Sequence, residues 1–225
     1  MKTQHIASAL ILGLCTTATS LADLVGVLDI AGSNGASTST TLNGLALPDG
    51  STYWTHQYIH EELTVSTTMV ASPIEDLQLA TIMQFSNSGT EDLQVEVAFS
   101  MTLSTLPPPL SEWLASQSLN IGGEDAMVET DTEPLWSVVV DDTLVASLFD
   151  NPFSFSAGQS GSASTYDTGN GTVFIDNWQT LQVRYAVDLS AGTTVGFNGG
   201  FAFVPTAASL WTLAPMLATR RRRRH

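Results

Sequence analysis

Apolar and polar residues alternate over long stretches of this chain, and this period of two is its clearest structural pattern. One stripe consists of Leu93, Val95, Val97, Phe99 and Met101, separated by polar or small residues. A second stripe covers residues 181–189 and a third covers 195–203. Because successive side chains of a strand point to opposite faces, each stripe predicts a strand with one face on a core.

Further strands are expected between turn-forming pairs, and their spacing is typical of an all-β fold. These strands are expected at 24–30, 53–70, 77–85, 126–130, 135–149 and 172–176. The turns are expected at Asn34-Gly35, Asn43-Gly44, 86–89, Asp141-Asp142, Asn170-Gly171 and Asn198-Gly199. The pattern predicts one antiparallel β-sandwich or jelly-roll-like domain over residues 23–202.

Three local features complete the expected fold. The Ser/Thr/Gly-rich segments 32–41 and 156–171 are expected to be exposed loops. One short helix is expected over 111–115, with Ser111 as its N-cap, because three prolines precede it. Gly196, Gly199 and Gly200 indicate a bulge or a close approach of neighbouring backbone.

Charge is distributed unevenly along the 225 residues. The whole chain has 22 acidic and seven basic side chains, a formal charge of −15 and a pI near 4.2. Residues 23–219 contain all 22 acids and a single base, Arg184, which gives that span a formal charge of −21. So little positive charge excludes binding to nucleic-acid phosphates or to an anionic membrane surface.

The first 22 residues have the organisation of a secretory signal peptide. Lys2 precedes an apolar run from Ile6 to Leu14, and Ser20-Leu21-Ala22 forms a small-residue cleavage site. The apolar run of about nine residues is too short for a bilayer, which needs roughly 20. We therefore expect signal peptidase to remove residues 1–22 during export. Cys15, the only cysteine, would leave with them, so the mature chain would have no disulfide.

The carboxyl end combines an apolar segment with a basic cluster. Residues 201–219 are apolar apart from interruptions at Pro205 and Pro215, and Arg220, Arg221, Arg222, Arg223 and Arg224 follow. A short hydrophobic helix with arginines beyond it is typical of a segment that stops in a membrane. We expect this tail to span residues 203–225.

The order of parts in this tail resembles the PEP-CTERM sorting domain of bacterial envelope proteins. In that family a Val-Pro-Glu-Pro type motif precedes the membrane segment and the basic cluster, and an exosortase recognises and processes the tail. Val204 and Pro205 match the motif, whereas Thr206 and Ala207 stand at the positions of the Glu and the second Pro. The resemblance implies an exosortase as partner, and a cell-envelope or extracellular-surface location with transient or stable anchoring. A plain single-pass anchor, or a terminal strand followed by a basic cloning remnant, are the alternatives.

One cluster of aromatic and imidazole side chains is the leading candidate for a ligand site. On a strand, Trp54, His56, Tyr58 and His60 would line one face, a stripe suited to stacking on a sugar or to covering a sheet. The two histidines would be about 13 Å apart on that strand, too far to share one zinc ion.

Two other chemistries are weaker candidates. Asp167 and Asn170 belong to a loop-like segment whose oxygen atoms could hold calcium, the one cofactor considered. Pairs of carboxylates, as in a glycoside hydrolase, occur at Glu61/Glu62, Glu75/Asp76, Glu91/Asp92, Glu124/Asp125 and Asp141/Asp142. Neighbouring residues on a strand face opposite ways, and most of these pairs fall at expected turns, so solvated loop charge is the preferred interpretation.

We therefore expect a secreted, envelope-sorted surface protein of structural or adhesive type, with no catalytic residues. A carbohydrate-binding module, with envelope or extracellular polysaccharide as partner, is the alternative. A glycoside hydrolase-like enzyme is the third hypothesis.

Overall fold

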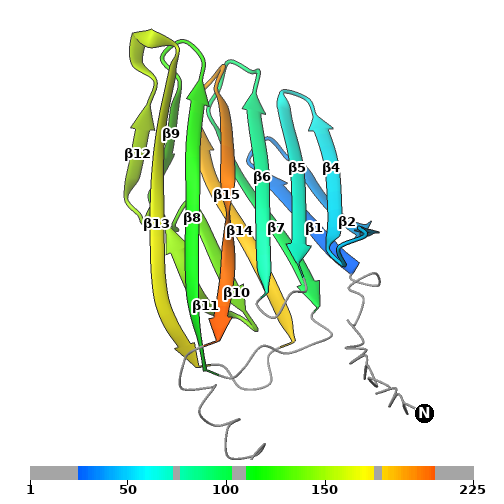
Figure 1. Cartoon of the computed structure of the whole chain (residues 1–225). Coiled ribbons are helices and arrows are strands. Elements are labelled where there is room, and N and C mark those ends of the chain that lie inside the picture. Colours follow the sequence, from blue (N-terminus) through cyan, green and yellow to red (C-terminus); the bar gives the residue numbers. More distant parts are fainter. Residues whose placement is uncertain (1–24, 73–76, 103–109, 175–178, 206–225) are drawn as a thin grey trace, which may run out of the picture.

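The computed structural model describes residues 25–72, 77–102, 110–174 and 179–205. These residues form two antiparallel sheets that pack face to face (Figure 1). The predicted all-β class with antiparallel sheets is confirmed. Within the described ranges, no helix is long and apolar enough to cross a membrane. Residues 1–24 and 206–225, on which the expected signal peptide and most of the sorting tail fall, lie outside the described residues.

Sheet A is the rear layer in Figure 1. Its main path runs β11 (Thr143–Leu148), β10 (Trp136–Val140), β14 (Thr180–Leu189), β7 (Leu93–Thr102), β1 (Val25–Gly32) and β2 (Ser37–Asn43). β9 (Met127–Thr130) pairs with the end of β14, and β12 (Phe153–Ser156) pairs with β9.

Sheet B is the front layer, and its order places the last described strand, β15, near its centre. The order is β13 (Ser162–Phe174), β8 (Leu110–Gly122), β15 (Thr194–Pro205), β6 (Gln78–Asn87), β5 (Leu63–Ser72), β4 (Thr52–His60) and β3 (Leu45–Ala46). A short 3-10 turn, η2 (Gly158–Ser160), precedes β13. β15 hydrogen-bonds to β6 on one side and to β8 on the other, so it joins the two halves of the sheet.

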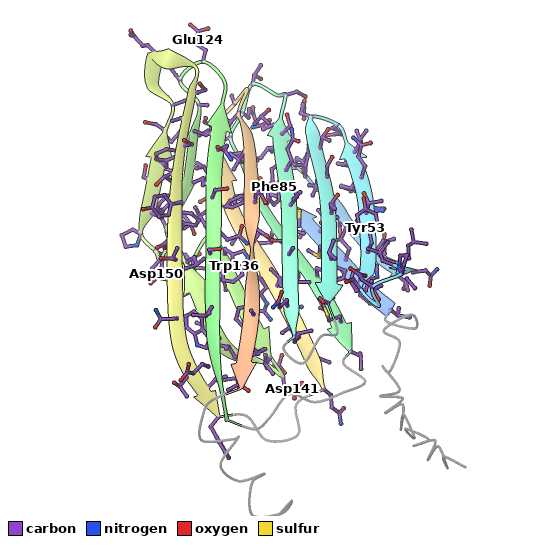
Figure 2. All side chains as sticks on the ribbon, in the orientation of Figure 1. Tyr53, Phe85, Glu124, Trp136, Asp141 and Asp150 are labelled. Carbon is purple, nitrogen blue, oxygen red and sulfur yellow. The ribbon has the colours of Figure 1, made fainter. Side chains whose placement is uncertain are left out.

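The core lies between the sheets and is built from the alternating apolar stripes. Every apolar residue of the first stripe is at most 7% exposed. Phe85, Tyr185 and Phe197 form an aromatic cluster with ring centroids 5.1–6.1 Å apart. Phe85 and Trp136 point into the space between the layers (Figure 2). Tilted and edge-to-face contacts of this kind are favourable beyond the apolar area that they bury.

A chain of polar side chains crosses this apolar core. Gln117 of β8 donates through Nε2 to Thr81 Oγ1 of β6 at 3.0 Å. Thr81 Oγ1 and the hydroxyl of Tyr185, in the opposite sheet, are 2.8 Å apart. Burial raises the pKa of the Tyr185 hydroxyl, so it remains protonated and able to donate. The bridge therefore links β6 and β8 to sheet A.

Gly199 of β15 makes this bridge possible. It lies between Thr81 and Gln117 in the register of sheet B. A Cβ atom at Gly199 would overlap the carbonyl oxygen of Ser116 and come within 2.8 Å of Gln117 Oε1. The close approach expected at this glycine is confirmed, whereas the turn expected at Asn198-Gly199 is wrong because both residues are inside β15.

Several local expectations are corrected by the structure. The helix expected at 111–115 is wrong, because these residues belong to β8 and pair with both β13 and β15. The loops expected at 32–41 and 156–171 are largely strand, since β2 and β13 fall within or across them. Asn170-Gly171, expected to be a turn, lies inside β13.

Tertiary packing explains why residues 162–171 form part of a strand instead of the expected loop. The ring of Trp113, on the neighbouring strand, lies over Gly169 and Gly171, where an added Cβ would come within 3.1 Å and 2.7 Å of it. The aromatic ring thus covers the backbone of two residues whose composition favours a loop.

The turn expected at Asp141-Asp142 is confirmed. Both residues have positive φ, 42° and 65°, as a two-residue hairpin between β10 and β11 requires.

The glycines of β15 provide a test of the central bridge. We expect Gly199→Ala to lower the free energy of unfolding by about 1–3 kcal/mol, the usual cost of overpacking, because the added methyl group meets backbone. Gly196→Ala, on the same strand, is the matched control because its Cβ would meet nothing within 4 Å. Urea denaturation of the full chain measures both. Equal stability of the two variants would contradict the proposed role of Gly199.

Candidate functional site

The stripe expected to bind a ligand lies on the inner side of β4. Trp54 is 2% exposed and packs edge-to-face on Phe99 of the opposite sheet, with centroids 5.4 Å apart. It is a core residue, so it presents no surface to a sugar. His56, Tyr58 and His60 follow on the same side and are half-buried. Tyr58 and His60 stack on each other, with an interplanar angle of 8°.

The residues expected to bind calcium are separated by the strand geometry. Asp167 and Asn170 both lie in β13, three residues apart, and therefore on opposite faces of the sheet. The Asp167 carboxylate contacts the residue that follows β11, since its Oδ2 accepts a hydrogen bond from the Phe149 backbone N–H at 2.8 Å. The two side chains cannot coordinate the same ion in this arrangement. In the described part of the chain, no group of three or more His, Cys, Asp or Glu residues is arranged to hold a metal.

Most of the paired carboxylates project from turns. Glu61/Glu62, Glu91/Asp92 and Glu124/Asp125 lie in three connections at one end of the sandwich, and all six side chains are exposed. We call this end the acidic rim. Figure 2 shows Glu124 there and Asp141, from another pair, at the opposite end. Glu75/Asp76 lies outside the described residues.

The outer face of sheet B is nearly free of charge, a feature that the sequence analysis missed. Among the described residues its only charged side chain is Glu112. Hydroxyl, amide, glycine and small apolar residues form the remainder, and six larger apolar or aromatic side chains are more than half exposed. These six are Leu45, Ile59, Ile82, Leu114, Tyr166 and Phe174. We call this surface the neutral face.

The contrast with the outer face of sheet A is clear. That face carries Asp29, Glu96, Glu129, Asp188 and the single described base, Arg184. The neutral face is also gently hollowed along β15. There Gly200 and Ala202 form a low floor between Gln78 on one side and Leu114 and Asn170 on the other. In the sequence, every even-numbered residue from 162 to 174 is uncharged. This alternation is the signal that could have revealed the neutral face.

The two described ends of the chain leave the sandwich at the same end, opposite the acidic rim (Figure 1). β1 begins there at Val25, and β15 finishes there at Pro205. Val204 and Pro205, the two residues on which the expected resemblance to a sorting motif rests, pair with Glu112 and Ser111 of β8. β15 therefore extends past the expected domain boundary at 202, and Phe203, assigned to the tail, is 1% exposed in the core.

No known family model matches the chain, and no curated protein matches it in sequence.

Two aspartates have perturbed pKa values of opposite sign. Partial burial raises the pKa of Asp188, and the nearby charges of Asp131 and Glu129 add to the effect. Asp141 has a lowered pKa, because its carboxylate accepts hydrogen bonds from the Thr180 hydroxyl and from the backbone N–H groups of Thr180 and Gln179. Asp188 and the turn at Asp141 belong to sheet A, whereas the histidines lie on β4 of sheet B.

The signs give opposite pH dependences. The fold disfavours the ionised form of Asp188. This form therefore lowers the stability of the fold at pH values above the raised folded pKa, and the destabilisation disappears as pH falls toward the ordinary pKa of aspartate. The ionised carboxylate of Asp141 stabilises the fold at pH values above its ordinary pKa, and this contribution is lost as pH falls through its lowered folded pKa.

We expect Asp188→Asn to raise the melting temperature at pH 7 and Asp141→Asn to lower it, with both differences shrinking in acid. Melting curves from pH 7 to pH 3 check this, and the same sign for both variants would contradict it.

Proposed function

We propose that this protein is an exported, envelope-sorted surface component of structural or adhesive type. The observation that carries the proposal is the exit of both described chain ends from one end of the sandwich. An anchor following Pro205 would hold the body by that end and direct the acidic rim away from the membrane. β8 and β13, of 13 residues each, would give the body a height of about 43 Å.

The charge distribution supports the same role. A domain with one base among 22 acids repels like-charged surfaces and remains soluble in salt. The neutral face is the part of the described surface where contact would bring the fewest charges together. A surface protein that must both stay dispersed and adhere needs these two properties on different faces.

The arginine cluster gives the test of sorting. We expect the full chain, expressed in a Gram-negative host, to lose residues 1–22 and to be recovered with the envelope. Replacing Arg220–Arg224 with serine should release it into the soluble fractions, because the basic stop after the apolar segment is lost. Arg184→Gln is the control for charge alone and should leave the location unchanged. Intact-mass spectrometry and fractionation give the readout.

Two outcomes of that experiment would change the proposal. A wild-type chain that stays in the cytosol with residues 1–22 attached would overturn export. A mature envelope species that retains residues 206–225 would argue against processing and favour a plain anchor.

A second candidate function is binding of neutral polysaccharide by the neutral face. Its polar groups include Gln57, Gln84, Asn120 and Asn198, all exposed, and amides are suited to hydrogen-bond sugar hydroxyls. The nearly uncharged surface favours a neutral glycan over an anionic one. This candidate replaces the stripe at 54–60, since Trp54 is buried.

We expect retention on an insoluble neutral polysaccharide that persists at high salt, because no ion pairs are involved. Asn198→Asp should weaken retention by placing a charge at the centre of the neutral face. Asn43→Asp, on exposed β2 in the other sheet, is the matched control. Equal retention of the two variants, or preference for a sulfated glycan, would contradict this candidate.

A further inference from the structure

β13 is an edge strand of unusual length. It pairs with β8 along all 13 of its residues, and in the described part of the chain no strand pairs with its other side. The strands at the other ends of the two sheets are shorter, with two residues in β3, seven in β2 and six in β11. An edge with no partner strand over this length is a template for another strand.

β13 carries only one of the usual devices that prevent edge pairing, the inward-pointing charge of Asp167. Proteins protect such edges with lysine, proline, bulges or inward-pointing charges. β13 has no lysine and no proline, its register with β8 is continuous, and Asp167 is its only charged residue. That aspartate accepts a hydrogen bond from the Phe149 backbone, which fixes the strand against sheet A. The edge is thus both open and held rigidly.

The sequence of β13 is complementary to itself in the antiparallel direction. A two-fold axis through Thr168 would align all 13 residues of two copies. Tyr166 and Phe174, 77% and 70% exposed, would then lie opposite the small polar residues Asn170 and Ser162. Asp167 would lie opposite Gly169, which avoids direct opposition of the two carboxylates.

We propose that β13 pairs antiparallel with β13 of a second copy, so that two sandwiches share one continuous sheet of 14 strands. The register is centred on Thr168, and the two neutral faces become one surface. This inference goes beyond the proposed function and does not depend on export, since it concerns the folded domain alone. Because each partner is strongly anionic, salt strengthens the association by screening their repulsion.

Disulfide cross-linking tests the register directly. Paired residues of antiparallel strands have Cα atoms about 4.5–5.5 Å apart, within the range that a disulfide spans. In a full chain carrying Cys15→Ser, Thr168→Cys introduces the single thiol at the axis. We expect oxidation to convert most of this variant to a covalent dimer. Gln84→Cys, also exposed but on β6 inside the sheet, should remain monomeric.

A charge substitution tests the same contact without covalent chemistry. Thr168→Lys places two ammonium groups opposite each other at the axis, while its exposed position in the single copy leaves the fold intact. We expect the association constant, measured by analytical ultracentrifugation of the full chain in mild detergent, to fall roughly fivefold. Gln84→Lys adds the same charge to the neutral face away from the edge and should associate like the wild type.

The outcomes separate this interface from the alternatives. Equal cross-linking at positions 84 and 168 would indicate random collision and overturn the proposal. Equal weakening by both lysines would indicate stacking of neutral faces instead. A wild type that is monomeric at every salt concentration, or a Thr168→Lys variant that associates unchanged, would also overturn it. Failure of envelope sorting in cells would leave these measurements unaffected.

Discussion

The sandwich depends on the insertion of its last strand. β15 lies between β6 and β8 and hydrogen-bonds to both, so sheet B is incomplete until residues 194–205 are in place. The packing is tightest at Gly199, where only a residue without a side chain fits between the backbone of β8 and the polar bridge from Gln117 to Tyr185. The strand that closes the fold is also the strand that leads into the tail, so the tail is joined directly to the centre of the sandwich.

Charge segregation gives the two sheets different roles. Sheet A carries acids and Arg184 on its outer face, and the acidic rim is at the end opposite the chain exit. Sheet B presents hydroxyls, amides and exposed apolar groups with only Glu112 as an ionised group among the described residues. Long-range repulsion and short-range contact are thereby assigned to different surfaces, an arrangement that the proposed surface component would need in order to adhere through one face.

The aromatic stripe shows how far local pattern can identify a site. Period two correctly places Trp54, His56, Tyr58 and His60 on one side of a strand. It does not say which side faces the opposite sheet, and contact with Phe99 makes Trp54 part of the core. The neutral face cannot be found from one strand, because each strand supplies only a few uncharged residues to it. The surface forms when β13, β8 and β15, which are distant in sequence, lie beside β6 and its sequential neighbours β5, β4 and β3.

The sequence alone determined the all-β class, most strands and the Asp141-Asp142 turn, because alternation and turn chemistry are local properties. It also determined the charge imbalance, since that is composition. Tertiary structure decided what composition obscured: β13 is a strand because Trp113 covers its glycines, and residues 111–115 are a strand because two neighbours supply their hydrogen bonds. Burial of Trp54 and exposure of the neutral face were decided in the same way, because the face of a strand that meets the core is fixed only when the two sheets pack.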